Sequence, residues 1–445
     1  MGDPEEPAAT STMAASGIAP IVPPDAAGEL DVSFSEDALS KLAQLLAAYG
    51  DTFRVYSPAL QRYLYVLSHP EQVKHILVVN HANYTKGTGF ERVQMLLGNG
   101  IIVSDGELWR SQRKMIQPAF HRSVIAQTSA HIRTANRELL AQWSAAADRG
   151  EAINLTHDTS EVTLEIVLRA LFGAGLDRMR EHGDNPFSIL TDESERNLTF
   201  AYKFRALSRL LLEDVERRRR DKICGPDFVS MLLDARDRRS GEPMADRQLL
   251  DEIITLIVAG HETTASVLNW TWYLLSQYPE VEHRVHAEVD ALNAAEPGID
   301  DMAQLPYTRQ VLAETMRLYP PVWLFTRRSI DADIVCDYAI PAQTDVLISP
   351  YFIHRHPQFW SDPERFDPMR FDPASNEINR YAYLPFGLGP RACIGEQFAL
   401  FEMQMHVLML ARQLRFEFDP RGAVELEPQV NLRTRHPLFM FPHRR

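Results

Sequence analysis

The stretch from Asp251 to about Tyr278 restricts the fold of this chain more than any other feature. Residues 251–275, DEIITLIVAGHETTASVLNWTWYLL, are apolar on almost every side of a helix. A helix of that kind is buried, so other elements must surround it. Its apolar run is broken at GHETT, well short of the roughly 20 apolar residues that a membrane-spanning helix needs. The sequence therefore predicts a long central helix inside a globular fold.

The rest of the chain predicts a mainly α fold with small β-sheets. Residues 105–295 show apolar faces at helical spacing almost throughout. Two short strands, TFRVYSP and RYLYVLS, precede them, and a Pro-rich irregular stretch follows Arg317. A last helix is expected around EQFALFEMQMHVLMLARQL. A length of 445 residues is compatible with one large enzyme fold.

Charge and cysteine content narrow the class of protein. The formal net charge of −14 speaks against nucleic-acid binding, because phosphate contacts require a basic surface. Three cysteines, at 224, 336 and 393, lie too far apart for a disulfide framework or a zinc site, so a reducing cytoplasm fits best. Residues 1–30 show no secretory signal and no membrane anchor. We expect a disordered Ala/Pro-rich tail at 1–30 and a single domain at 31–445.

The loop PFGLGPRACIG, residues 385–395, surrounds a cysteine with structure-breaking residues. A reduced buried cysteine is most often a small hydrophobic residue. Here the glycines allow close backbone approach, Arg391 adds positive charge and Phe386 can cover the sulfur, which together favour a thiolate at Cys393. The loop offers no histidine base for a nucleophile and no further ligand for a zinc site. A single thiolate is what a haem iron needs, since the porphyrin supplies the other donors.

Glu262 and Thr263 interrupt the apolar run of the central helix. Burying a carboxyl group costs several kcal/mol unless the group is paired or hydrated. One interpretation is a hydrated kink in which the Thr hydroxyl bonds back to a carbonyl oxygen. The other is an acid and an alcohol that relay protons in a cavity, with Gly260 letting a ligand approach the backbone. The residues alone leave both open.

Two further helical pairs carry charge. Glu314 and Arg317 project from one face of a helix that prolines end, and alone such a pair is usually a surface salt bridge worth less than about 1 kcal/mol. Trp109 and Arg113, at i and i+4, present hydrogen-bond donors on one face. That pair suits a carboxylate or a phosphate, or else belongs to an ordinary amphipathic helix.

In chain order, these four features resemble the cytochrome P450 family. FGLGPRACIG matches the cysteine loop of that family at every fixed position. AGHETT matches its oxygen-activating helix motif, ETMR its Glu-x-x-Arg pair and WRSQR its Trp-x-x-x-Arg. The resemblance extends over roughly residues 35–440. It implies the cytochrome P450 fold, with haem b between the long central helix and the helix that follows the cysteine loop.

The resemblance also implies which residues hold the haem. Cys393 would be the axial thiolate ligand of the iron, shielded by Phe386. Four side chains would bind the haem propionates: Trp109, Arg113, Arg327 and Arg391. Arg327 is preferred to its neighbour Arg328 by its distance from LYPP.

A buried structural triad is implied for Glu314, Arg317 and an arginine of the following segment. Two look-alikes are available, PERF at 363–366 and PMRF at 368–371. By its spacing from HRHPQFW we prefer the second, hence Arg370, although Met369 replaces the usual Glu. Leu388 likewise replaces a commoner Gly in the cysteine loop.

The implied activity is the insertion of one oxygen atom from O2 into a C–H or C=C bond, with Glu262 and Thr263 as catalytic residues that manage protons. The distal pocket would be lined by Ile102, Ala259, Val322 and Phe325. Apolar side chains there suit a small apolar substrate, such as a terpenoid, a fatty acyl or a polyketide-like molecule. The stretch 172–203 is shorter than usual for the family, which predicts a more open roof.

Electrons would come from a separate ferredoxin or flavodoxin with its reductase. A basic patch for that acidic partner is expected from Arg110, Arg113, Lys114 and Arg122, although a solvated face is an equal alternative. The run ERRRR at 216–220 is expected to be a solvated helix end. The competing functions are a peroxide-using or substrate-rearranging enzyme and a non-catalytic haem sensor. Glu262 and Thr263, suited to proton delivery, favour the monooxygenase.

Overall fold

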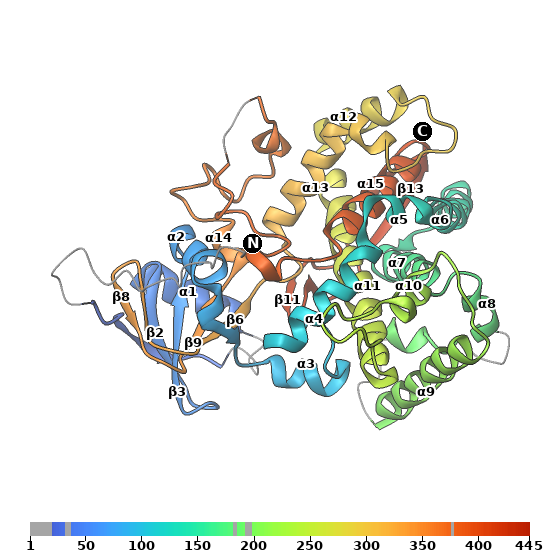
Figure 1. The fold of residues 1–445 in the computed structure, drawn as a ribbon. Coiled ribbons are helices and arrows are strands. Elements are labelled where there is room, and N and C mark those ends of the chain that lie inside the picture. Colours follow the sequence, from blue (N-terminus) through green and yellow to red (C-terminus); the bar gives the residue numbers. More distant parts are fainter. Residues whose placement is uncertain (1–19, 32–36, 181–184, 192–197, 375–377) are drawn as a thin grey trace, which may run out of the picture.

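The computed structural model describes residues 20–31, 37–180, 185–191, 198–374 and 378–445, and for residues 198–202 it describes the backbone only. Helices gather on one side of the molecule and the largest sheet lies on the other, with α11 (Asp246–Gln277) running between them (Figure 1). The predicted mainly α fold with small β-sheets is confirmed.

Fifteen α-helices lie within the described residues. Besides α11 they are α1 Ala38–Tyr49, α2 Pro70–Lys74, α3 Phe90–Leu97, α4 Gly106–Ile116, α5 Arg122–Ile125, α6 Ser129–Arg149, α7 Leu155–Phe172, α8 Gly175–Arg180, α9 Leu198–Arg220, α10 Phe228–Asp234, α12 Pro279–Ala291, α13 Pro306–Leu318, α14 Pro350–Ile353 and α15 Glu396–Ala411. Short helical turns connect them, among them η5 Ser188–Leu190, η7 Pro368–Phe371 and η8 Gly389–Arg391.

The described strands form one larger sheet, in the order β1-β2-β3-β9-β6-β4, and three smaller sheets, β10-β13-β5, β11-β12 and β7-β8. Their bounds are β1 Asp25–Glu29, β2 Thr52–Ser57, β3 Arg62–Leu67, β4 Tyr84–Lys86, β5 Ile153–Asn154, β6 Phe325–Ser329, β7 Asp333–Val335, β8 Tyr338–Ile340, β9 Asp345–Ile348, β10 Leu414–Phe418, β11 Leu426–Pro428, β12 Leu432–Thr434 and β13 Phe439–Arg444. Strands from two regions far apart in the sequence, residues 25–86 and 325–348, thus meet in the larger sheet, and β4 forms one of its edges.

The central helix α11 is buried as its sequence predicts. Trp270 and Trp272 have almost no exposed surface, and α7, α9, α13 and α15 all contact the helix. It begins at Asp246, earlier than the apolar pattern indicated, and it ends at Gln277 because Pro279 opens the next helix and cannot continue this one. Among the described residues no helix combines the length and the apolar composition needed to cross a membrane.

Described structure begins before residue 31, the expected start of the domain. Asp25–Glu29 pairs in parallel with β2, and Arg54 of β2 forms an ion pair with Asp25. The segment DAAGE has little intrinsic strand preference, so only its partner strand makes it a strand. Residues 1–19 of the expected tail lie outside the described residues.

The run 216–220 is not simply a solvated helix end. Arg218 is buried at the end of α9, where it pairs with Asp214 at 2.7 Å and Asp227 at 3.0 Å. Its guanidinium also donates to the carbonyl oxygen of Phe172 at 2.9 Å. This arginine therefore ties α9 to the end of α7 and the start of α10.

Candidate functional site

The cysteine loop is held by its backbone against the segment before β4. The N–H of Cys393 donates to the carbonyl oxygen of Phe386 at 2.8 Å, which closes the loop. Gly389 has a φ of +70°, and a Cβ there would lie 1.9 Å from the carbonyl oxygen of Leu77. Only glycine fits at this position, because both the left-handed backbone and the close approach exclude a side chain.

Cys393 combines free side-chain surface with dense surroundings. The side chain is exposed in the protein, yet neighbouring protein atoms desolvate the thiol enough to raise its pKa. The N–H groups of Gly395 and Glu396 and the charge of Arg113 oppose that rise. The sulfur thus keeps free surface within dense surroundings, as a ligand to a buried metal must.

The source of positive charge near the sulfur differs from the expectation. We expected Arg391 to favour a thiolate, but the arginine that acts on Cys393 is Arg113, whose Nη1 donates to the carbonyl oxygen of Ala392 at 2.9 Å. Arg391 points away, forms an ion pair with Asp105 and stacks its guanidinium 4.2 Å from the ring centre of Trp109. Burial alone would leave this cysteine a thiol.

Arg391 belongs to a pocket between the cysteine loop, α4 and the start of the larger sheet. Three of the four residues expected at the propionates line it, namely Trp109, Arg327 and Arg391. Its other lining residues are Ile76, Leu77, His81, Tyr84, Leu388 and Pro390. The structure thus brings together side chains that are far apart in the sequence.

Positive charge in and beside this pocket exceeds negative charge. Arg327 is buried, and the described residues offer it no carboxylate within 4.0 Å, only the carbonyl oxygen of Thr326 at 2.8 Å. Desolvation, together with the charge of Arg391, lowers the pKa of Arg327 to about 10. Desolvation and the charges of Arg327 and Arg391 hold the pKa of Lys86 well below its usual range. Asp105 is the single carboxylate that counters these cations electrostatically, so the site suits a ligand with acidic groups.

The neighbouring Arg328 has a different environment. It pairs bidentately with Asp345 of β9, at 3.0 and 2.9 Å, within the larger sheet. Successive side chains of a strand point to opposite faces, so Arg327 and Arg328 cannot share one partner. The structure therefore places Arg327, and not Arg328, at the pocket.

Sequence reasoning missed Lys86, His81 and Tyr84. They precede the cysteine loop by some 300 residues and form no recognisable motif. Only the pairing of β4 with β6, which sets Lys86 opposite Arg327, brings the lysine to the site.

In α11 the acid and the alcohol are half-buried, as are their neighbours Val258, Ala259 and Gly260. The hydroxyl of Thr263 donates to the carbonyl oxygen of Ala259 at 2.8 Å, as the structural interpretation required. Glu262 is not left without a partner, since the side-chain amide of Asn431 donates to its Oε2 at 2.8 Å. Both residues are thus held in defined positions.

Gly260 does not make room for a ligand at the backbone, as the functional interpretation of this glycine expected. A Cβ at this position would lie 2.9 Å from Cγ2 of Val167 on α7. The missing side chain lets α7 pack closely on α11, and its place is not open to a ligand.

An apolar pocket lies between η5, α9 and α11. Its lining residues are Leu190, Phe204, Leu207, Ile254, Ile257 and Val258. None of the four expected pocket residues is among them. Ile102, Ala259 and Phe325 are half-buried and Val322 is 39% exposed, so each keeps free surface elsewhere. Part of the roof stretch, residues 181–184 and 192–197, falls outside the described residues.

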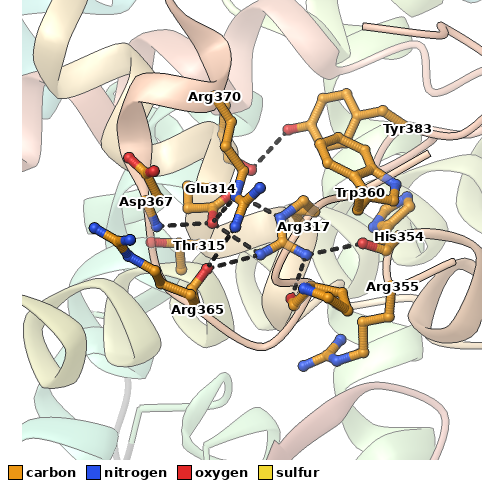
Figure 2. Close-up of polar contacts among 12 residues, drawn as sticks. Glu314, Thr315, Arg317, His354, Arg355, Trp360, Arg365, Asp367, Arg370 and Tyr383 are labelled. Carbon is orange, nitrogen blue, oxygen red and sulfur yellow. Dashed lines mark hydrogen bonds and ion pairs between the residues drawn. The ribbon is translucent and has the colours of Figure 1, made fainter. Parts of the chain in front are cut away.

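Glu314 and Arg317 form a fully buried ion pair, not a surface one (Figure 2). Two hydrogen bonds join them, and Arg317 also donates to the carbonyl oxygens of His354 and Pro363, at 2.9 and 2.7 Å. Nε of Arg370 lies 3.3 Å from Oε1 of Glu314. Arg365 of PERF contributes its carbonyl oxygen to Arg317 instead, at 3.2 Å. The cluster fixes the irregular stretch to α13.

Comparison with known proteins identifies the family. The family model described as Cytochrome P450 matches residues 30–217 and 201–440. Cyclooctatin synthase of Streptomyces melanosporofaciens is 35% identical over 90% of this chain and 90% of its own length. Cyclooctat-9-en-7-ol 5-monooxygenase of the same organism is 34% identical over 84% of each chain. The protein LUTEIN DEFICIENT 5, chloroplastic, of Arabidopsis thaliana is 33% identical over 92% of this chain and 74% of its own.

The family implies haem b, and the residues present fit that group. A haem needs one soft axial ligand and cationic donors for two propionates. The open sulfur of Cys393 and the undercompensated cations Arg327 and Lys86 meet both requirements. This chain belongs to the cytochrome P450 family and is a haem b-dependent monooxygenase that acts on an organic substrate with O2 and an electron-transfer partner.

Proposed function

We propose that this enzyme inserts one oxygen atom from O2 into an apolar, hydrocarbon-rich molecule of the terpenoid kind, by hydroxylation or epoxidation. The proposal is carried by the similarity to cyclooctat-9-en-7-ol 5-monooxygenase. It agrees with the apolar surroundings of α11, where Leu, Ile, Val and Phe side chains line a gap that is too narrow for a substrate in this structure. Such a lining favours a hydrocarbon over a polar substrate. The name cyclooctat-9-en-7-ol denotes a hydrocarbon skeleton with a single hydroxyl group, so a relative acts on a molecule of this character.

The proposed haem site uses Cys393 as the axial ligand. Trp109, Arg113, Arg327 and Arg391 would hold the propionates, with Lys86 as an additional cation. Bound in this way, the haem supplies the oxygen chemistry, because thiolate donation favours O–O cleavage. Arg391 would turn from Asp105 to a propionate or bind both.

The proposed catalytic residues are Glu262 and Thr263. Thr263 is half-buried, and its hydroxyl group, which now donates to the Ala259 carbonyl oxygen, would hold and pass on a proton at the site once it gave up that acceptor. Glu262 is the adjacent carboxylate and would supply protons from the side of the β11–β12 hairpin. A non-catalytic haem sensor would need neither residue.

The proposed redox partner is a separate ferredoxin or flavodoxin with its reductase. The expected basic patch is weaker than its sequence indicates, since Arg110 pairs with Glu107 and Arg122 pairs with Asp300. Arg113 is directed inward to the cysteine loop. Lys114 is exposed like Arg110 and Arg122 but forms no ion pair within the described residues, so the docking surface must draw on further residues of that face.

The test is turnover with isotopically labelled dioxygen. Terpenoids are first screened for a change in the haem absorbance on binding, and the best binders are incubated with NAD(P)H and a surrogate ferredoxin system. The proposal predicts a product that carries one labelled oxygen atom. Turnover with hydrogen peroxide but not with dioxygen and the ferredoxin system would instead identify the peroxide-using alternative, and binding without turnover would identify the sensor.

A further inference from the structure

The hairpin of β11 and β12 rests on the part of α11 that carries the catalytic acid. Nδ2 of Asn431, at the tip of the hairpin, donates to Oε2 of Glu262 at 2.8 Å. One turn along the helix, Oγ of Ser266 donates to the carbonyl oxygen of Leu432 at 2.8 Å. Residues at i and i+4 share one helix face, so two adjacent hairpin residues engage the same face of α11.

The hairpin tip is also fixed from its other side. The N–H of Leu432 donates to the carbonyl oxygen of Pro321 at 2.8 Å. The indole N–H of Trp323, a buried side chain, donates to the carbonyl oxygen of Gln429 at 2.8 Å. Asn431 therefore projects from a tip that three other hydrogen bonds hold in place, and its contact with Glu262 is not an incidental surface contact.

The chemistry of the contact is specific. A side-chain amide donates hydrogen bonds but neither releases nor takes up a proton near neutral pH. A hydrogen bond donated to a carboxylate oxygen fixes the direction of that carboxylate. Asn431 can thus hold Glu262 ready to accept a proton without competing for that proton.

We propose that Asn431 is a positioning residue for Glu262, which holds the carboxylate on the hairpin side of α11 and so sets the point from which protons reach Thr263. The inference rests on the proposed role of Glu262 in proton delivery. It assigns a function to a residue that lies 169 positions from its partner and outside every motif of the chain.

The balance of electrons and protons in the reaction predicts the effect of losing the hydrogen bond between Asn431 and Glu262. Oxygenation of a substrate by O2 consumes two electrons from the redox partner and two protons, and it yields the oxygenated product and water. When protons are misdirected, the same electrons and protons leave as hydrogen peroxide and the substrate is not oxidised. Hydrogen peroxide supplied as the oxidant already contains both electrons and both protons, so turnover driven by it needs no proton delivered from solvent.

The first experiment measures product formed per NAD(P)H consumed, with the terpenoid that turns over fastest. Asn431→Asp replaces the donor with a second carboxylate, and we expect the ratio to fall several-fold while hydrogen peroxide release rises. Gln429→Glu is the matched control, because it makes the same change of charge on the same hairpin tip at a residue that bonds Arg433 instead. It should leave the ratio unchanged. Peroxide-driven turnover of Asn431→Asp should also be unchanged, and an equal loss in both assays would overturn the proposal.

The second experiment does not depend on activity. Hydrogen exchange of the segment 429–434 should become several-fold faster in Asn431→Asp, because two carboxylates repel each other across the former contact. The double variant Glu262→Gln with Asn431→Asp exchanges donor and acceptor, so it should restore slow exchange. It should not restore coupled turnover, because the acid then lies on the hairpin and not beside Thr263. Unaltered exchange in Asn431→Asp, or full recovery of coupling in the double variant, would overturn the proposal.

Glu262→Gln separates this inference from the function on which it rests. If Glu262→Gln leaves the ratio of product to NAD(P)H unchanged, the proton role of Glu262 is wrong, and the inference is overturned with it. If Glu262→Gln lowers the ratio and Asn431→Asp does not, the proposed function stands and only the role of Asn431 is overturned.

Discussion

Arg317 donates two hydrogen bonds to Glu314, at 2.7 and 2.8 Å, and neither side chain has any exposed surface. A pair buried to this degree depends on its geometry, because an unmatched buried charge is costly. Arg317→Lys keeps the charge but loses the fork that also reaches the His354 and Pro363 carbonyl oxygens. We expect a loss of about 3 kcal/mol in the free energy of unfolding, measured in urea.

The control for this change is Arg122→Lys. Arg122 pairs with Asp300 at the surface, where both side chains are largely exposed, so a change within about 0.5 kcal/mol is expected. Equal stability of the two variants would show that the buried pair does not hold the irregular stretch to α13.

Substitutions of Arg327 and of Arg328 should have opposite effects. The first should weaken haem binding, and the second should lower the stability of the haem-free protein. Arg327→Gln removes a buried cation without a carboxylate partner, so the haem-free protein should be at least as stable as the wild type. The same change should speed haem loss to an acceptor protein by about tenfold, the effect of roughly 1.4 kcal/mol. Arg328→Gln breaks the pair with Asp345, so it should destabilise the haem-free protein and leave haem loss unchanged. The reverse pattern would place Arg328 at the propionates.

Glu252 makes stability depend on pH. This carboxyl group accepts a hydrogen bond from the Ile101 N–H at 2.9 Å, and desolvation raises its pKa from 4.5 to about 8. The native state therefore keeps a proton that the unfolded chain releases above pH 4.5. The stability that this group contributes is present below about pH 4.5 and falls as pH rises toward about 8. The loss is up to about 1.4 kcal/mol per pH unit.

Glu252→Gln should remove that dependence. The amide oxygen can still accept from Ile101, and no group remains to ionise. Unfolding midpoints measured between pH 5 and pH 8 should fall less for this variant than for the wild type, whereas a change of the exposed Glu138 to Gln should alter nothing. Parallel pH curves for wild type and Glu252→Gln would show that Glu252 is ionised in the folded protein.

The close packing of Val167 on Gly260 predicts that a side chain at position 260 is destabilising. Gly260→Ala should be stabilising by about 1 kcal/mol from helix preference alone, yet its Cβ would lie 2.9 Å from Val167. We expect a net loss of about 1–3 kcal/mol from overpacking, and partial recovery when Val167→Ala is added. A stabilised Gly260→Ala variant with weaker substrate binding would restore the ligand interpretation of this glycine.

The sequence predicted the site where chemistry restricts residue choice locally. The cysteine loop is an example, because its glycines are required by a left-handed backbone and by the Leu77 carbonyl oxygen. The choice of Arg327 and Arg370 over their neighbours was possible from spacing, since strand alternation and the short turn η7 fix which side chain faces inward.

Long-range partners could not be predicted in this way. Asn431 and Lys86 reach the site only because a hairpin and a sheet edge fold against it, and nothing in their local sequence indicates this. The ion pair of Arg391 with Asp105 could not be predicted for the same reason, since Asp105 lies 286 residues away. Arg218 was taken for a solvated residue because Asp227, which helps to bury it, belongs to the next helix.

The reduced-CO spectrum of Cys393→Ala compared with the wild type tests the central claim most directly. The wild type should show the absorption typical of a thiolate-ligated haem, and Cys393→Ala should lose it, while Cys224→Ala and Cys336→Ala, at exposed cysteines, should keep it. An unchanged thiolate spectrum in Cys393→Ala would contradict the assignment of the axial ligand and the mechanism built on it.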